Sequence, residues 1–238
     1  TIHPMRLLAF ETATEACSVA VYVDGEICER FDLAPRRHAE LALPWAGTML
    51  AEAGIARSQL DAIAVGRGPG AFTGVRLAIA IAQGIALALD RPVLPVSTLA
   101  ALAMRAGASN EGDRILAAID ARMGEVYLGA FARRGDDLVA LDTEVVVKPE
   151  GASIPDGDGW HGVGTGFAAA GNALPLRLEG RLAAVDATAL PHAADVARLA
   201  ALAYARGEAV AAERIEPAYL RNNVALTLAE QQALRAKG

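Results

Sequence analysis

The feature that most constrains the fold is a short apolar strand that ends in a carboxylate and turns back into a second strand. This feature occurs twice: residues 7–11 read LLAFE and residues 116–120 read LAAID. A second strand is predicted after each of them, at 17–23 and at 125–131. We interpret the repetition as a weak internal duplication, with chance similarity of two hairpins as the alternative.

The first hairpin has a predicted register because its turn is explicit in the sequence. Asp24-Gly25 separates strands predicted at 17–23 and 26–33, and this dipeptide is typical of a two-residue turn. With that turn, the position numbers of facing residues add to 49, which places Cys17 opposite Asp32 and Cys28 opposite Val21. The only two cysteines are therefore not expected to form a disulfide, and a reducing, cytoplasmic location is expected.

Helices and strands alternate after this hairpin, which predicts an α/β protein with a mixed sheet and helices on its faces. In the first half we predict a helix at 39–53, a strand at 62–65, a helix at 75–89, a strand at 93–96 and a helix that Ser97 caps and that runs to 105. The second half is less regular, with a strand at 145–147, a loop zone at 149–166 and a helix at 193–206. A polar stretch at 107–113 separates the halves.

The charge balance limits the classes of partner. The 238 residues include 22 Lys and Arg against 28 Asp and Glu, a net charge of −6. Tight nucleic-acid binding by this chain alone is not expected, because that affinity depends on neutralising phosphates with Lys and Arg. A membrane role is not expected either, because no apolar run reaches the roughly 18 residues that a spanning helix needs.

The sharpest local motif is the glycine-rich turn at 66–74, which lies between a predicted strand and a predicted helix. Such a turn exposes backbone N–H groups and a helix N-terminus, and both favour anions. It is not a Walker A loop, because the Lys and Ser/Thr that should follow the closing glycine are absent. The alternative is that the glycines only permit a tight turn and close helix packing. The candidate nucleotide-binding residues are Glu11, Thr12, Gly68, Gly70 and Thr73.

Other catalytic chemistry has no candidate in the sequence. The four histidines are far apart and none forms H-E-x-x-H, so we predict no metal site. There is no G-x-S-x-G nucleophile motif, and we assign no catalytic residue. The helix at 75–89 carries no charge between Leu77 and Leu89 and is apolar on all sides. It is either a core helix covered on both sides or a helix whose outer side docks a partner subunit.

Three longer motifs resemble the TsaB family, also called YeaZ, whose bacterial members take part in making threonylcarbamoyladenosine at position 37 of tRNA. They are residues 8–20 (LAFETATEACSVA), 61–76 (DAIAVGRGPGAFTGVR) and 119–127 (IDARMGEVY). Residues 217–221 (PAYLR) look like the C-terminal motif of the family. The resemblance implies an actin-like ASKHA (ribonuclease H-like) fold made of two related subdomains, with mixed sheets flanked by helices. We expect the first subdomain at 5–108, the second at 109–221 and a flexible tail at 222–238.

The resemblance also implies a role as a noncatalytic scaffold for TsaD, the related transferase. TsaD carries H-x-x-x-H metal ligands, and the resemblance places Thr98 and Leu102 at those two positions. Neither side chain replaces an imidazole ligand. Glu11 departs from the Asp that family members often have.

The expected partners follow from this role. We predict a heterodimer with a TsaD-like transferase, with a TsaE-like ATPase joining through the complex and tRNA bound mainly by the partners. No cofactor is expected to bind tightly, ATP is expected to be bound by partner subunits, and a homodimer is expected when the partner is absent. The predicted docking residues are Trp45, Met49, Val75, Ala78, Ile79, Ala82 and Ala86.

Two rival functions remain open at this stage. One is an ASKHA-type ATP-dependent phosphotransferase that uses Glu11, Thr12, the loop at 68–73 and Asp120, with the glycine-rich residues 162–166 as an adenosine loop. The other is a metallopeptidase, which the missing histidine pair argues against.

Overall fold

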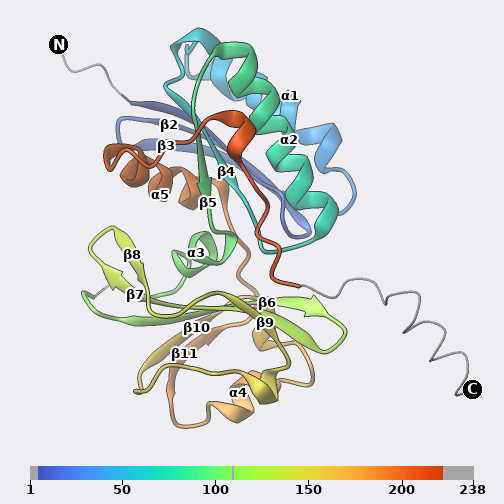
Figure 1. The fold of residues 1–238 in the computed structure, drawn as a ribbon, viewed down its shortest axis with the longest axis vertical. Coiled ribbons are helices and arrows are strands. Elements are labelled where there is room, and N and C mark those ends of the chain that lie inside the picture. The colour runs from blue at the N-terminus through green and yellow to red at the C-terminus, as the bar shows by residue number, and fades with distance from the viewer. Residues whose placement is uncertain (1–4, 109, 222–238) are drawn as a thin grey trace, which may run out of the picture.

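The computed structural model describes residues 5–108 and 110–221, which form two stacked lobes around two sheets (Figure 1). The first sheet has the strand order β3-β2-β1-β4-β5, and the second has the order β11-β10-β6-β7-β8, with β9 paired to β7. Read in the opposite direction, the second order places β6 and β7 where β1 and β2 lie in the first. The internal duplication predicted from the two hairpins is thus confirmed at the level of topology.

The strands and helices have the following bounds. The strands are β1 Arg6–Glu11, β2 Ala16–Val23, β3 Glu26–Leu33, β4 Ala62–Gly66, β5 Val93–Val96, β6 Arg114–Arg122, β7 Glu125–Arg134, β8 Asp137–Ala140, β9 Val145–Val147, β10 Trp160–Val163 and β11 Leu182–Asp186. The helices are α1 His38–Glu52, α2 Phe72–Leu89, α3 Thr98–Ala103, α4 Ala173–Arg177 and α5 Ala193–Ala205.

The first hairpin has the predicted register. Cys17 lies opposite Asp32, and Cys28 lies opposite Val21. The turn residues Asp24 and Gly25 have φ values of 48° and 99°, as expected for the two positive-φ positions of a type I′ turn. The turn chemistry alone was therefore sufficient to set the pairing of β2 with β3.

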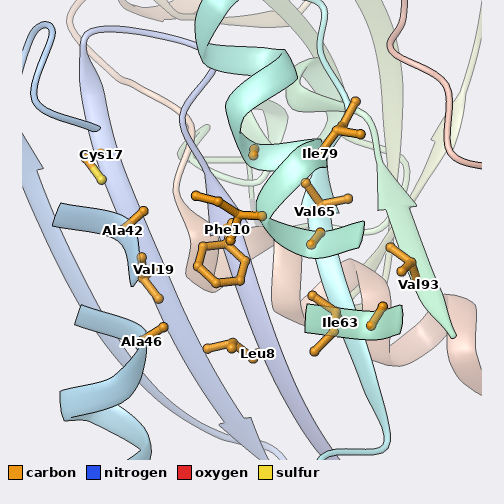
Figure 2. Close-up of a cluster of buried hydrophobic side chains, with 14 of the residues drawn as sticks. Leu8, Phe10, Cys17, Val19, Ala42, Ala46, Ile63, Val65, Ile79 and Val93 are labelled. Carbon is orange, nitrogen blue, oxygen red and sulfur yellow. The ribbon is translucent and has the colours of Figure 1, made fainter. Parts of the chain in front are cut away.

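The first sheet is covered by helices on both faces because side chains alternate along β1. Leu8 and Phe10 point to the face that α1 and α2 cover, where Ile79 is among the contacts (Figure 2). Leu7 and Ala9 point to the opposite face, which α5 covers. We call the first sheet together with α1, α2 and α5 the first lobe.

The second sheet uses the same alternation with different helices. Ile115 and Ala117 of β6 pack in one cluster with residues of α3. Leu116 points to the opposite face and packs in the cluster that contains Leu174 of α4. We call the second sheet together with α3 and α4 the second lobe. Along the chain, the first sheet ends with β5 at Val96 and the second begins with β6 at Arg114, but the helices do not divide in the same way. Helix α3, before β6, covers the second sheet, and α5, after β11, covers the first.

One sequence expectation about this region needs correction. The loop zone predicted at 149–166 contains β10, and β11 and α4 follow it. These elements are too short to show a period in the sequence, since β10 has 4 residues and β11 and α4 have 5 each. The tail expected at 222–238 lies outside the described residues.

Helix α2 is also longer than predicted, because it begins at Phe72. Its 18 residues have a mean hydropathy of 1.7, so a segment of membrane-spanning length and composition does occur, contrary to expectation. One face of the helix, including Ala78 and Ala82, packs against the first sheet. This packing is that of a core helix in a globular protein.

Candidate functional site

The end of β1 carries a buried carboxylate. Glu11 is 1% exposed, and its Oε1 accepts a hydrogen bond from the backbone N–H of Ala13 at 2.7 Å. Its Oε2 accepts one from the Thr98 hydroxyl at 2.9 Å. Burial raises the pKa of Glu11 to about 7, although hydrogen bonds from Ala13, Thr98 and Thr12 act in the opposite direction. Thr12, the next residue, is also fully buried, so this strand end is closed to solvent.

The glycine-rich loop closes tightly onto this strand end. The Thr12 hydroxyl donates to the carbonyl of Gly74 at 2.7 Å, and the backbone N–H of Ala71 donates to the carbonyl of Ala13 at 2.7 Å. A Cβ at Gly74 would lie 2.0 Å from the Thr12 carbonyl oxygen, and a Cβ at Gly70 would lie 2.4 Å from that of Ala13. The glycines are required at these positions because the two backbones approach so closely.

Thr98 connects this loop to α3. Its hydroxyl accepts a hydrogen bond from the backbone N–H of Gly68 at 3.1 Å while donating to Glu11, and its own N–H donates to the Gly68 carbonyl at 2.9 Å. Thr98 and Leu102, at the two positions where the resemblance places the metal ligands of TsaD, are both fully buried. Among residues 5–108 and 110–221, no group of three or more His, Cys, Asp or Glu side chains could hold a metal ion.

The second lobe repeats the arrangement in simpler form. A Cβ at Gly164 would lie 2.3 Å from the carbonyl oxygen of Ala118, near the end of β6. The Thr165 hydroxyl accepts a hydrogen bond from the backbone N–H of Asp120 at 3.2 Å. The loop at 162–166, interpreted as a faint adenosine loop, is therefore packed against its own strand end as the loop at 66–74 is.

An open cleft of about 530 Å³ lies between the lobes, which we call the interlobe cleft. Its charged lining residues come from both lobes and include Arg36, Asp120 and Arg122. Of the five predicted nucleotide-binding residues, only Gly70 lines it. Glu11 and Thr12 are buried behind the loop, Gly68 is buried within it, and Thr73 lies on the exposed side of α2. The structure thus does not bring the five residues together on one accessible surface.

Sequence reasoning missed several residues of this cleft. Arg36 has a φ of 69° in the turn before α1, and Tyr127 comes from β7. Residues 217–221 form one wall. The motif PAYLR was the only sequence signal that could have placed this last segment at a specific position.

The predicted docking residues need correction. Val75, Ala78, Ile79, Ala82 and Ala86 are all at most 6% exposed and face the first sheet. On α1, Met49 is 3% exposed, and Trp45 is half-buried against the same core. The prediction treated the apolar residues of α2 as a free surface, but the first sheet covers the side of the helix on which these residues lie.

The outer faces of α1 and α2 carry different residues. Leu43 of α1 is 51% exposed, and Leu87 of α2 is 64% exposed. Small residues, Ala80 and Gly84, are also exposed on α2. These four residues define what we call the outer helix face.

Two lobes with the same strand order, each with a glycine-rich loop closed on its first strand, define a two-lobed protein of the actin-like ASKHA (ribonuclease H-like) class. A family model described as "TsaD: tRNA N6-adenosine threonylcarbamoyltransferase" matches residues 32–229. The chain is 45% identical over 228 residues to the tRNA threonylcarbamoyladenosine biosynthesis protein TsaB of Escherichia coli (strain K12), covering 93% of this chain and 96% of that protein. The corresponding protein of Haemophilus influenzae is 41% identical over 229 residues, covering 92% and 95%. The chain belongs to the TsaB family.

Solved structures agree with this assignment. YeaZ from Pseudomonas aeruginosa superimposes with a TM-score of 0.83 at 48% identity, covering 91% of this chain and all of that one. A crystal structure described as an uncharacterized protein with similarity to peptidase YEAZ, from the same organism, gives a TM-score of 0.84 at 47% identity and the same coverage. The resemblance read from the sequence motifs is thereby confirmed.

Proposed function

We propose that this chain is a noncatalytic subunit required for forming N6-threonylcarbamoyladenosine at position 37 of tRNAs that read codons starting with A. It acts as a scaffold for a TsaD-like transferase in the cytoplasm. Two relatives with more than 90% mutual coverage are named tRNA threonylcarbamoyladenosine biosynthesis proteins, which supports the pathway.

The main support for a noncatalytic role is the closed hydrogen-bond network of Glu11, Thr98 and Gly68. The Glu11 carboxylate is buried, and both of its oxygens accept hydrogen bonds from the protein. The Thr98 hydroxyl both donates and accepts within the network. A phosphate or a metal would need these groups to be accessible, and reaching them would require breaking the contact between the loop and the strand end.

The outer helix face is the proposed docking surface for the transferase. On α2 it presents the exposed side chain of Leu87 on the same side as Ala80 and Gly84, whose small size permits another helix to approach closely, and on the neighbouring α1 it presents Leu43. The net charge of −6 supports assigning the main tRNA contacts to the partners. In this proposal a TsaE-like ATPase joins through the complex, ATP is bound by the partner subunits, and the same face allows a homodimer when the transferase is absent.

Reconstitution of the tRNA modification with and without this chain tests the role. Formation of threonylcarbamoyladenosine is expected to fall to background when the chain is omitted. Unchanged formation would refute the accessory function. Titration of the isolated chain with Mg²⁺ and ATP tests the rival phosphotransferase, which requires saturable binding and hydrolysis or phosphoryl transfer by this chain alone.

Leu87→Glu tests the docking surface, with Leu176→Glu as the matched control. Leu176 lies on α4 of the second lobe and is 69% exposed, so both variants place a charge at an exposed leucine. Co-purification with the transferase is expected to be lost for Leu87→Glu and kept for the control. Equal co-purification of both variants would exclude the outer helix face as the docking surface.

A further inference from the structure

Residues 217–221 form a segment that touches both lobes, and neither the fold nor the proposed function explains it. The segment follows the last short helical turn, Ala212–Arg214, which lies on the first lobe. It then runs down toward β6 of the second lobe, where it is drawn in red in Figure 1. Its residues line the interlobe cleft on one side and a second, more open groove near Arg67 and Glu144 on the other.

The upper end of the segment is fastened to the first lobe. The backbone N–H of Ala218 donates a hydrogen bond to the carbonyl of Arg67, in the glycine-rich loop, at 2.8 Å. The guanidinium of Arg76 on α2 lies 3.2 Å from the centre of the Phe72 ring and 5.1 Å from that of Tyr219. A cation between two aromatic rings attracts both, so this contact ties the segment to the first turns of α2.

The lower end is fastened to the second lobe through one side chain. Nη2 of Arg221 donates to the carboxylate of Glu125 at 2.6 Å and to the carbonyl of Ala121 at 3.1 Å. The Arg221 and Glu125 side chains are 23% and 30% exposed, so solvent screens this pair less than it would an exposed pair. Ala121 and Glu125 lie on β6 and β7, on either side of the hairpin turn.

The position of this attachment matters for the angle between the lobes. Another ion pair between the lobes joins Arg206, at the end of α5, to Asp137 at the start of β8, at 2.7 Å. In Figure 1, α5 and β8 lie on the left side of the molecule, whereas residues 217–221 descend to the right of them. Thr98 of α3 also joins the second lobe to Glu11 and Gly68 of the first lobe, and Arg105, just beyond α3, pairs with Asp195 of α5 at 3.5 Å. Residues 217–221 add an attachment on a different side from the Arg206–Asp137 pair, and attachments on different sides resist hinge opening together.

We propose that residues 217–221 are an interlobe clasp, with Arg221 as the positioning residue that holds the two lobes at a fixed angle and keeps the interlobe cleft narrow. The inference concerns the isolated chain and does not depend on the proposed function. This role explains the PAYLR motif without any contact to a substrate or a partner.

A distance measurement between the lobes tests the clasp. Spin labels are placed on cysteines introduced at Ala51 of α1 and at Glu179 beyond α4, both exposed, in a Cys28→Ser background. Double electron–electron resonance then measures the distance distribution in the otherwise unchanged full-length chain. Arg221→Gln is expected to shift the distribution to longer distances and to widen it.

Two further variants keep the result interpretable. Glu125→Gln removes the other partner of the ion pair and is expected to widen the distribution as well, and it also serves if Arg221→Gln fails to fold by circular dichroism. Arg214→Gln removes an exposed arginine just before the clasp and is expected to leave the distribution unchanged. A distribution that stays as narrow as that of the parent in a folded Arg221→Gln or Glu125→Gln variant overturns the proposal.

Discussion

Replacing Glu29 by Ala is expected to loosen α5 from the first sheet. Helix α5 has no capping side chain of its own, and residues of β2 and β3 cap it instead. Oε1 of Glu29 accepts a hydrogen bond from the backbone N–H of Ala194 at 3.0 Å and from the Ser18 hydroxyl at 2.6 Å. The Ser18 oxygen in turn accepts from the backbone N–H of Ala193 at 2.9 Å. The first turn of α5 is therefore capped from a strand that lies far away in the sequence.

The expected loss follows from these contacts. Oε2 of Glu29 also pairs with Nδ1 of His192 at 2.9 Å, and the two side chains are only 19% and 18% exposed. Loss of a helix cap costs about 1 kcal/mol, and loss of a hydrogen bond to a charged group costs about 1.5–3 kcal/mol. Since these contacts share one carboxylate, we expect the free energy of unfolding to fall by about 2–4 kcal/mol for Glu29→Ala. For a chain of this size that corresponds to a decrease in Tm of roughly 5–15 °C.

The pH dependence gives the prediction a second signature. Burial by itself raises the pKa of Glu29, but hydrogen bonds from His192, Ser18 and Ala194 outweigh it, so the net pKa lies below 4.5. A carboxylate whose folded-state pKa is lowered contributes stability that is present above its unfolded pKa and is lost as the pH falls through the folded value. The difference between parent and Glu29→Ala should therefore be largest above about pH 5 and shrink in more acidic solution.

Urea unfolding followed by circular dichroism measures this effect at several pH values. Glu26→Ala is the matched control, because Glu26 lies on the same strand and is exposed, and its replacement should change stability by less than about 0.5 kcal/mol. If Glu29→Ala were no less stable than Glu26→Ala at neutral pH, the capping of α5 by the first sheet would be wrong as an account of its stability.

Three further predictions concern the core and the buried carboxylate. Ile79→Glu should unfold the chain, because Ile79 is 6% exposed and the charge would be buried unpaired, whereas Leu87→Glu on the same helix should keep its far-ultraviolet circular dichroism spectrum and melting temperature within a few degrees. The raised folded-state pKa of Glu11 favours the protonated folded form, so the free energy of unfolding of the parent should fall by about 3 kcal/mol as the pH rises from about 4.5 to 7. Glu11→Gln should abolish this decline. Urea titrations in which the variant keeps the decline would contradict the reasoning. Gly74→Ala should destabilise by about 1–3 kcal/mol, because its Cβ would meet the Thr12 carbonyl, whereas Gly84→Ala, with open space around it, should be neutral or stabilising in thermal melts.

Much of the first half could be predicted because its signals are local. The Asp24-Gly25 turn set the register of β2 with β3, and Ser97 caps α3 by accepting a hydrogen bond from the backbone N–H of Ala100, as expected. Less of the second half could be predicted. Its strands β10 and β11 are short, and their pairing with distant strands leaves no period in the sequence to detect.

The candidate site shows the same division between what is local and what is not. The sequence singled out Glu11 and the glycine-rich loop because an acid at a strand end and clustered glycines are visible in one stretch of chain. It did not show that Thr98, 87 positions from Glu11, donates a hydrogen bond to it. That contact decides whether the strand end is an open anion site or a buried, fully hydrogen-bonded contact. Only the packing of β1, β4 and α3 brings the two residues together.

The sequence by itself determined the duplicated topology, the first hairpin and, through several motifs in order, the family. These depend on turn chemistry, on alternation along strands and on the residues of contiguous segments, all of which act over a few positions. The tertiary structure decided which side of α2 is free, that α3 and α5 each cover the sheet of the other half, and that the glycine-rich loop closes on Glu11. Burial of a face depends on what packs against it, and in this chain the packing partners lie far away in the sequence.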